Sequence, residues 1–454
     1  MRGSRRFLIA VLFVGMLTCS DLVSISHAAV SSGADASPTA GEANTGGVIP
    51  LVSWPMFHNT PSHLGFNPLE TTITKANANR LGIAWQGLMG DIADHSSPAI
   101  ANGIAYIGSF DGRLYAFNAG GCGQDTCQPL WSGATENDIQ SSPAVMNNTV
   151  YIGSEDHKLY AFAANGCGKS DCPPLWVGLT NGAVSSSPVA TATTVYVGSE
   201  DHNFYAFAAG GCGQSTCAPL WMVPTGDRIS SSPALVNNVL YFGSWDGKLY
   251  AVNAQGCGRQ VCTPLWTAQV GSIVLSSPAV SNGVVYIASF NEKNSTDSRL
   301  YAFNANGCVQ LTCRPLWSAP AGDFVESSPA IANGVVYVGS GDDLLYAFDA
   351  KGCGGALSCN FLWRGIAIGA QAALISSPAI ANGLVYVGEN NGMVEVFDAA
   401  GCGQGICLPV TQLRINNEPI VASSPAVVNG TVYVGSADQF GFPRGRLYVY
   451  KLVR

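Results

Sequence analysis

The sequence predicts an all-β fold made of eight copies of one unit, and three observations support this prediction. The triplet Ser-Ser-Pro recurs eight times, at intervals of 45 residues four times in succession and then of 51, 49 and 47. Short apolar runs separated by turn signals lie between the triplets, and no segment reads as a helix. A fixed period of this size is typical of a radial β array. The triplets end at Pro98, Pro143, Pro188, Pro233, Pro278, Pro329, Pro378 and Pro425.

Each unit contains four apolar runs in a fixed order. In the first unit Ser-Ser-Pro-Ala-Ile is followed by Asn102-Gly103, and the second run ends at Asp111-Gly112. Both dipeptides favour hairpin turns, because such turns need positive φ and glycine has no Cβ to oppose it. A Leu-Tyr-Ala-Phe run, a cysteine loop and a Pro-Leu-Trp run complete the unit. The sequence therefore predicts an eight-bladed β-propeller of four-stranded antiparallel blades.

The proline of each triplet indicates which strand lies innermost. Proline cannot donate a hydrogen bond to a neighbouring strand, so it is found at the edges of sheets. Because it stands at the start of the first run in all eight units, we expect that strand to face the axial channel.

The two ends of the repeat array predict how the ring closes. The segment Asn79–Trp85 matches a fourth strand but precedes the first triplet, whereas the last unit stops after Tyr450 without one. We expect the N-terminal strand at Trp85 to complete the last blade, which removes the open edges of the array. The preceding segment, Trp54–Pro68, is expected to be irregular and to lie across one face.

Residues 1–28 read as a signal peptide. Arg2, Arg5 and Arg6 precede the apolar stretch Phe7–Leu17, and Ser26-His27-Ala28 fits a cleavage site. Residues 29–50 are rich in small and polar residues and are expected to form a flexible leader, so the propeller takes 51–454. We expect an exported protein that is secreted, periplasmic or at the cell surface, with a lipid anchor at Cys19 as an open alternative.

The cysteines predict disulfide bonds. One of the fifteen, Cys19, lies in the signal peptide, and the others form seven pairs between the third and fourth strands. Paired cysteines at repeated spacing in an exported protein are expected to be oxidised. Zinc is the alternative, but a structural zinc site needs four ligands and each loop offers two. The expected disulfides are Cys122–Cys127, Cys167–Cys172, Cys212–Cys217, Cys257–Cys262, Cys308–Cys313, Cys353–Cys359 and Cys402–Cys407.

The charge balance excludes one class of partner. Only 11% of the residues are charged, and the net charge is −8. No basic patch is present that could replace the counterions of a phosphate backbone, so we expect no nucleic-acid partner. We also expect a monomer with no transmembrane span in the mature chain.

The repeat resembles the PQQ-like (pyrroloquinoline quinone repeat) β-propeller family. The elements Ser-Ser-Pro-Ala-(Ile/Val), Val-Tyr-Val-Gly-Ser, Leu-Tyr-Ala-Phe-Asp-Ala and Pro-Leu-Trp are similar to that repeat over Val52–Arg454. The resemblance extends to quinoprotein alcohol dehydrogenases, to polyvinyl-alcohol-dehydrogenase-like proteins and to the non-catalytic outer-membrane assembly lipoprotein. It implies structural tryptophans that lock blade to blade, at Trp85, Trp131, Trp176, Trp221, Trp266, Trp317 and Trp363, while unit seven departs with Val410.

The resemblance raises the question of an active site. The quinoprotein dehydrogenases place their cofactor beneath a ring of adjacent cysteines and beside a calcium ion and a catalytic Asp. This chain has no adjacent pair of cysteines and no long insertion that could build a cofactor chamber. We therefore predict no catalytic residue, metal or cofactor, with PQQ and Ca²⁺ in a dehydrogenase as the alternative.

Residues that break the repeat are the better indication of function, because folding already explains the repeated ones. His95 and Glu326 are the ionisable residues at the position before the triplets, and with Gln140 they are the candidate ligand residues of the central funnel. Solvated loop residues are the alternative interpretation. The residues at this position are assigned as His95, Gln140, Ser185, Ser230, Leu275, Glu326, Ser376 and Ala422.

Two neighbouring units carry a Glu-Asp-His sequence at the second hairpin, at 155–157 and 200–202. A His with two carboxylates could bind a metal. Asp is expected in such a turn in any case, and we favour the turn.

These observations together predict an exported, non-catalytic propeller that acts as a binding or interaction scaffold. Its partner is a protein, a glycan or a small molecule. The alternative is a PQQ-dependent, quinoprotein or polyvinyl-alcohol-dehydrogenase-like oxidoreductase with its ligand in the central funnel.

Overall fold

The computed structural model describes residues 53–290, 298–369, 373–415, 423–436 and 445–453. The predicted signal peptide and leader lie outside these ranges, and so do residues 291–297 and 437–444, between the second and third strands of the fifth and eighth units. The described residues belong to one compact unit. The described part is β-structure with one short 3₁₀ helix, η1 (Ala78–Arg80), and none of its helices is long and apolar enough to span a membrane.

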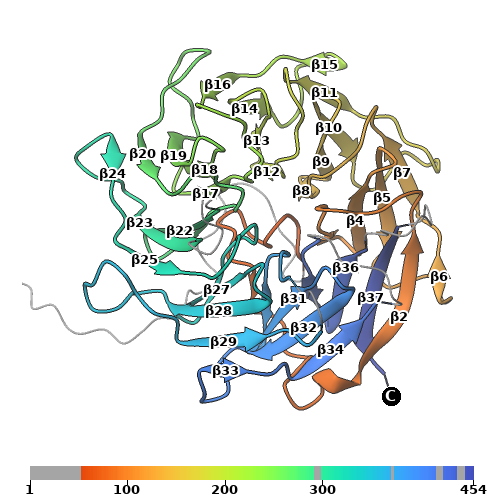
Figure 1. Ribbon diagram of the computed structural model, residues 1–454. Coiled ribbons are helices and arrows are strands. Elements are labelled where there is room, and N and C mark those ends of the chain that lie inside the picture. Colours follow the sequence, from red (N-terminus) through yellow and green to blue (C-terminus); the bar gives the residue numbers. More distant parts are fainter. Residues whose placement is uncertain (1–52, 291–297, 370–372, 416–422, 437–444, 454) are drawn as a thin grey trace, which may run out of the picture. The chain divides into compact units, whose positions relative to one another are not determined.

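Eight antiparallel sheets follow one another around an axis, as predicted (Figure 1). Blade 1 contains β3 (Ala99–Ala101), β4 (Ile104–Ser109), β5 (Arg113–Asn118) and β7 (Trp131–Ala134). Blade 2 contains β8 (Ala144–Met146), β9 (Thr149–Ser154), β10 (Lys158–Ala163) and β11 (Trp176–Leu179). Blade 3 contains β12 (Val189–Ala190), β13 (Thr194–Gly198), β14 (Asn203–Ala208) and β16 (Trp221–Pro224). Blade 4 contains β17 (Ala234–Val236), β18 (Val239–Gly243), β19 (Lys248–Asn253) and β20 (Trp266–Gln269).

The second half of the ring repeats this order. Blade 5 contains β21 (Ala279–Ser281), β22 (Val284–Ser289), β23 (Arg299–Asn304) and β25 (Trp317–Pro320). Blade 6 contains β26 (Ala330–Ala332), β27 (Val335–Gly339), β28 (Leu344–Asp349) and β29 (Trp363–Ile366). Blade 7 contains β30 (Ala379–Ala381), β31 (Leu384–Gly388), β32 (Met393–Asp398) and β34 (Thr411–Arg414). Blade 8 contains β35 (Ala426–Val428), β36 (Thr431–Gly435), β37 (Arg446–Leu452) and β2 (Leu81–Leu88).

The pairing in blade 8 confirms that the N-terminal strand completes the last blade. Strand β2 runs antiparallel to β37, with Trp85 opposite Val449 and Leu88 opposite Arg446. Figure 1 shows the orange β2 beside the dark blue β37. The two ends of the repeat array are therefore held by one sheet.

Both surfaces of each blade are buried, which explains the nearly continuous apolar strands. In β10 the residues Leu159, Tyr160, Ala161 and Phe162 are all buried, although successive side chains point to opposite faces of a strand. Leu159 and Ala161 pack in one hydrophobic cluster, with residues of blade 3, and Tyr160 and Phe162 in another, with residues of blade 1. Packing between blades therefore provides the core.

All seven predicted disulfides are present, and their loops also join neighbouring blades, which the sequence did not predict. The loop of each blade runs parallel to the outer strand of the preceding blade. Four of these contacts form two-residue strands, β6 (Thr126–Cys127), β15 (Thr216–Cys217), β24 (Thr312–Cys313) and β33 (Ile406–Cys407), so that blades 8, 2, 4 and 6 gain a fifth strand. The bonded pairs are those predicted above.

Each cysteine loop also covers a buried tryptophan of the preceding blade. A Cβ built on Gly166, in the loop of blade 2, would lie 2.6 Å from Cδ1 of Trp131 in blade 1. Gly211 lies similarly close to the indole of Trp176, and Gly401 to that of Trp363. Glycine is needed here because φ is positive and because no side chain fits against the indole.

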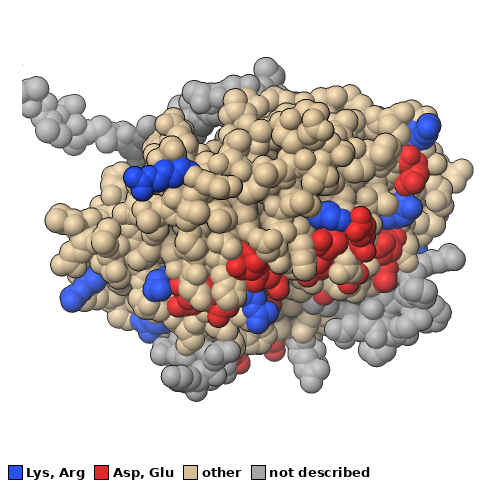
Figure 2. Space-filling model, turned by 90° about the horizontal axis from the view of Figure 1, so that it is seen from above, with Lys and Arg blue, Asp and Glu red and all other residues tan. Residues whose placement is uncertain are grey.

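The turns of a blade alternate between its two ends. The first hairpin turn and the cysteine loop lie at one end, which we call the loop face. The second hairpin turn and the connection to the next blade lie at the other end, which we call the mouth face. Most carboxylates of the turns belong to the mouth face, including Asp94, Glu155, Glu200 and Glu326. In a side view, Asp and Glu side chains gather in a band toward one edge (Figure 2).

Candidate functional site

The two serines of each Ser-Ser-Pro triplet build the wall of the axial channel. The first serine accepts a hydrogen bond from the second strand of its own blade, as when the Ser96 hydroxyl accepts from Gly108 N–H at 2.9 Å. The second serine accepts from the backbone N–H of the equivalent serine in the preceding blade, as when Ser187 Oγ accepts from Ser142 N–H at 2.9 Å. These eight bonds form a closed ring around the axis.

The N-terminal segment 53–67 crosses the channel near the loop face. Trp54 exchanges two backbone hydrogen bonds with Ile100 of β3, and β1 (Phe66–Asn67) runs parallel to β30. Between these points the segment accepts hydrogen bonds from the inner strands of blades 2, 4, 5, 6 and 7, through the carbonyls of Pro55, Pro61, Ser62, Leu64 and Gly65. Met56, Phe57, His58 and His63 are buried within it.

The two histidines of this segment belong to its packing. Burial lowers the pKa of His58 to about 4, and burial together with the nearby His58 lowers that of His63 to about 3. Both rings are therefore neutral at physiological pH. The His58 ring stacks on Phe57 with centroids 4.4 Å apart.

A cavity of about 310 Å³ lies in the channel on the mouth side of this segment. Phe57 contributes to its wall from the N-terminal segment, and serines of the hydrogen-bonded ring, such as Ser187 and Ser277, line it around the axis. Residues that precede the triplets also line it. A volume of this size is at the lower end of the range for small-molecule sites.

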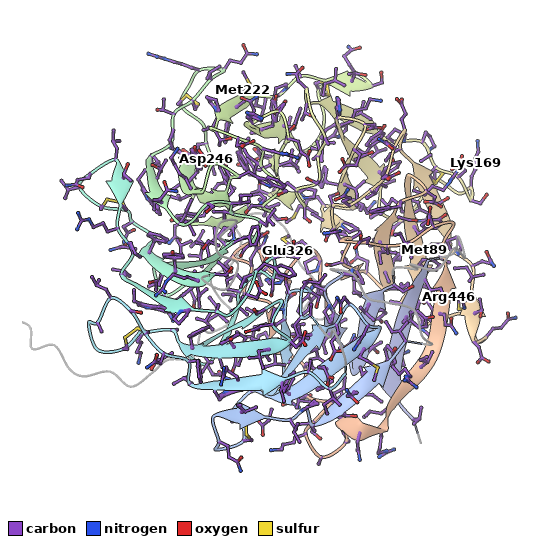
Figure 3. All side chains as sticks on the ribbon, viewed as in Figure 1. Met89, Lys169, Met222, Asp246, Glu326 and Arg446 are labelled. Atoms are coloured by element: carbon purple, nitrogen blue, oxygen red, sulfur yellow. A yellow bond between two sulfur atoms is a disulfide. The ribbon has the colours of Figure 1, made fainter. Side chains whose placement is uncertain are left out.

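The structure places the three candidate ligand residues, His95, Gln140 and Glu326, in the lining of this one cavity. In Figure 3 Glu326 lies near the centre of the ring, whereas Met222 and Lys169 lie toward its outer edge. The cavity thus gathers positions that are far apart in the sequence. Ser185, Ser230 and Leu275 from the same predicted set line it too.

One predicted position was wrong, and one cannot be placed. Ile375, and not Ser376, precedes the seventh triplet and lines the cavity. Ser376 is the first serine of that triplet, and its hydroxyl accepts a hydrogen bond from Gly388 N–H at 2.6 Å. Ala422 lies outside the described residues.

His95 stands among carboxylates. Its Nδ1 lies 3.0 Å from Asp94 Oδ1, and its side chain is 46% exposed. Burial would lower the pKa of His95, but the hydrogen bond and charge of Asp94 and the charges of Glu326 and Glu155 raise it. The pKa of Glu326 is raised by burial and by Asp94, while His95 opposes this shift.

The sequence did not reveal two further glutamates of this region: Glu200, and Glu155, which is not in the lining but is near enough to Glu200 and His95 for their charges to shift its pKa. Glu200 lines the cavity. Burial raises the pKa of Glu155 to about 7, with added contributions from the charges of Glu200 and Asp138, and its buried Oε1 has no hydrogen-bond partner among the described residues. Both glutamates stand where other blades have Phe110, Trp245 or Phe290.

Part of the wall is aromatic. Trp245 lines the cavity and donates from Nε1 to Ser230 Oγ at 2.8 Å. The Arg228 guanidinium lies 4.2 Å from the centroid of the Trp245 ring and 3.9 Å from Glu200 Oε2. The indole therefore already holds one cation of the chain itself.

The Glu-Asp-His sequences form turns. Asp156 and Asp201 each accept a hydrogen bond from a tyrosine hydroxyl of the same hairpin, Tyr160 and Tyr205, at 2.5 and 2.6 Å. No group of three His, Cys, Asp or Glu side chains that could hold a metal ion is found in the described ranges.

The residues of the cavity do not fit PQQ. This cofactor is a planar tricyclic quinone with three carboxylates, so a site for it needs cationic partners. The lining contains two carboxyl groups, Glu200 and Glu326, and one basic side chain, His95, and the carboxylates of Asp94 and Glu155 lie close by. The surroundings of the cavity therefore favour a cationic ligand over an anionic one.

Blade 7 departs from the other blades at one buried pair. Glu389 replaces the serine that ends the second strand elsewhere, and Glu395 replaces the following tyrosine. Both side chains are fully buried. Ile368 N–H and Gln412 Nε2 donate to Glu395 Oε1 at 3.0 and 2.6 Å, whereas Glu395 Oε2 and both oxygens of Glu389 have no partner among the described residues.

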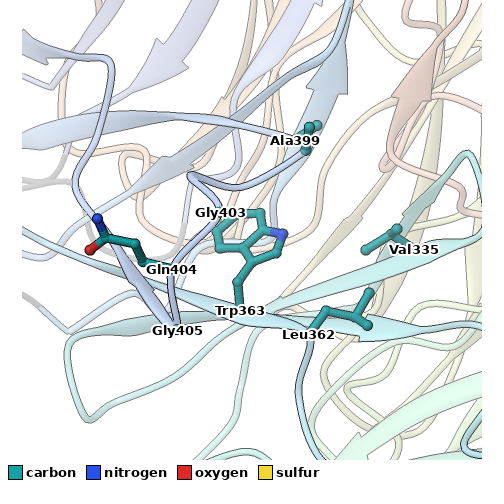
Figure 4. A pocket seen from close by; sticks show the side chains of 8 residues that line it. Val335, Leu362, Trp363, Ala399, Gly403, Gln404 and Gly405 are labelled. Carbon is teal, nitrogen blue, oxygen red and sulfur yellow. The ribbon is translucent and has the colours of Figure 1, made fainter.

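A second, shallower recess lies on the loop face (Figure 4). Trp363 of β29 and the loop Gly403–Gly405 of blade 7 line it, together with Leu362, Val335 and Ala399. It has no charged side chain in its lining. We assign it to the packing of the cysteine loop on the tryptophan.

Comparison with solved structures supports the fold. BamB from Moraxella catarrhalis matches with a TM-score of 0.60 and 16% identity, over 82% of this chain and 97% of that one. A europium-containing methanol dehydrogenase matches with a TM-score of 0.66 and 13% identity, over 89% and 98%. The computationally designed Ika8 protein matches with a TM-score of 0.59 and 14% identity, over 80% and 98%. At such identities these matches show the fold alone.

Comparison of the sequence gives the family. No curated protein matches the chain. The family model described as outer membrane protein assembly factor BamB matches residues 66–211, 213–311 and 308–446. Seven disulfides and a BamB-like fold indicate an extracytoplasmic protein. The chain therefore belongs to the PQQ-like repeat family of BamB-type β-propellers.

Proposed function

We propose that this chain is an exported, non-catalytic binding propeller whose ligand site is the axial cavity on the mouth face. The observation that carries the proposal is the crossing of the channel by residues 53–67, which leaves a cavity of about 310 Å³ with Phe57 in its wall. The residues that break the repeat, including His95, Gln140 and Glu326, line that cavity. Residues that differ from repeat to repeat and gather at one site on a rigid scaffold are typical of a binding function.

The competing function is a PQQ-dependent oxidoreductase. The dehydrogenase among the solved structures shares only the fold with this chain. The excess of carboxylates around the cavity disfavours a tricarboxylate, and the described residues offer no group of three metal ligands.

Titration of PQQ into the mature, oxidised protein, with and without Ca²⁺, distinguishes the two functions. Calorimetry and visible absorbance measure binding, and dye reduction with short alcohols measures activity. We expect no saturable binding and no dye reduction above that of free PQQ. Saturable one-to-one binding that is lost in a His95→Ala/Glu326→Ala variant, together with dye reduction, would establish the oxidoreductase instead.

A further inference from the structure

Acidic side chains stand on two sides of the axial cavity: Glu200 and Glu326 line it, and Glu155 lies near Glu200. Glu155 and Glu200 come from the second hairpins of blades 2 and 3, and Glu326 comes from the connection into blade 6. Arg228 lies 3.9 Å from Glu200, and no hydrogen bond or ion pair to Glu326 is found in the described part of the chain. Among the described residues, Glu155 and Glu200 together have one ion pair, that of Glu200 with Arg228, and Glu326 has none. Each of these two acidic regions could therefore hold an added positive charge.

The wall between the two acidic regions is partly apolar and partly hydroxylated. Leu275 and Ile375 line it at the positions that precede triplets, and Phe57 and Trp245 add aromatic surface. Ring serines such as Ser187 and Ser328 line it too, with only 6% and 4% exposure. Each of their oxygens accepts one N–H, and no acceptor for their hydroxyl hydrogens is found among the described residues.

These hydroxyls are an independent indication of an occupant. A buried hydroxyl hydrogen without an acceptor is costly unless water or a ligand takes it. The ring serines also keep one lone pair, so each can accept from an ammonium group as well. The cavity therefore offers methylene contacts, polar contacts around the axis and carboxylates at two sides.

We infer that the axial cavity binds a short aliphatic diamine, with one ammonium at Glu155 and Glu200 and the other at Glu326. The inference rests on the proposed binding function and names its ligand class. A chain of four to six carbons is small enough for about 310 Å³, and its methylenes contact Leu275 and Ile375.

Three four-carbon probes of different charge test this inference by calorimetry with the mature, oxidised protein. They are 1,4-diaminobutane, 1,4-butanediol and succinate. We expect the diamine to bind one to one and at least tenfold more tightly than the diol, and succinate not to bind. We also expect the affinity for the diamine to fall as salt is added, because the attraction is electrostatic.

Two isosteric variants locate the ammonium groups. Glu155→Gln and Glu326→Gln should each weaken diamine binding about tenfold, since each removes one charge pair. Asp125→Asn, at an exposed position of a cysteine loop on the opposite face, is the matched control and should leave the affinity unchanged. Circular dichroism of each variant verifies that it is folded.

Binding of the diamine should also release part of a proton near pH 7. The pKa of Glu155 is about 7, and an ammonium beside it would lower that pKa. Calorimetry in two buffers of different ionisation enthalpy measures this release.

The outcomes separate the inference from the proposed function. If the diol binds as tightly as the diamine, or if both glutamine variants keep full affinity, the diamine inference is wrong while the cavity remains a binding site. If none of the probes binds, the inference is also wrong. Binding of PQQ with dye reduction would overturn the proposed function itself.

Discussion

Replacing Glu389 with glutamine should make the protein more stable at neutral and alkaline pH. Glu389 and Glu395 face each other in the blade 7 hairpin, where Glu395 pairs with Val387 and is diagonal to Glu389. Burial raises the pKa of Glu389 to about 10, and the nearby charge of Glu395 adds to this shift, with a smaller contribution from Asp343. Glu389 is therefore protonated in the folded protein at neutral pH, beside the carboxyl group of Glu395.

The sign of the effect follows from the proton balance. In the unfolded chain Glu389 titrates near its ordinary pKa of about 4.5, so between that pH and about 10 the folded state holds one proton more. Because the pKa of Glu389 is higher in the folded state, its protonation stabilises the fold fully below the unfolded-state pKa. This stabilisation is lost as the pH rises toward the folded-state pKa. The free energy of unfolding therefore falls by about 1.4 kcal/mol per pH unit, or by about 3 kcal/mol between pH 6 and 8.

The Glu389→Gln variant removes this titration and keeps a neutral polar side chain of nearly the same shape. Equilibrium urea unfolding at pH 6, 7 and 8, without reductant, measures the free energy of unfolding of both proteins. We expect the free energy of unfolding of the variant, relative to that of the wild type, to increase by about 1.4 kcal/mol per pH unit. The exposed Asp125→Asn substitution is the control, and its free energy of unfolding should have the same pH dependence as that of the wild type. Equal pH slopes for wild type and Glu389→Gln would refute the raised pKa of Glu389.

Three further comparisons test the packing between blades, each by urea unfolding. Gly166→Ala should cost about 1–3 kcal/mol more than Gly168→Ala, because both glycines have positive φ but only a Cβ at Gly166 meets an indole; equal costs would contradict the contact. Removing the disulfide Cys167–Cys172 by a double serine substitution should cost about 2 kcal/mol for a loop of this size, and an unchanged midpoint would contradict that. Ser187→Ala leaves a buried N–H without its acceptor and should cost about 1–3 kcal/mol, whereas Ser187→Thr should restore part of the loss.

Repetition explains why the fold could be predicted from one sequence. Eight copies of the same turn signals and apolar runs indicate the same blade, and the unmatched strand at Trp85 indicates its partner at the other end of the chain. The parallel pairing of the cysteine loops with the preceding blade had no signal of this kind. It depends on how far a loop reaches across the gap between two blades, as for Cys217 beside Gly178.

The candidate site was only partly visible for a similar reason. His95, Gln140 and Glu326 stand out because they break the repeat beside a fixed triplet. Glu155 and Glu200 also break it, but the aspartate that follows each of them already accounts for the turn. That their side chains belong to the cavity region depends on the orientation of the hairpin relative to the axis. The part played by Phe57 depends on the path of residues 53–67 across seven blades, which no local pattern encodes.

The most direct test of the account is a crystal structure of the mature protein grown with 1,4-diaminobutane. We predict that residues 53–67 cross the channel and that the diamine lies on their mouth side, with its nitrogens near Glu155 and Glu326. A channel open from one face to the other, or a diamine bound only on the loop face, would contradict the account.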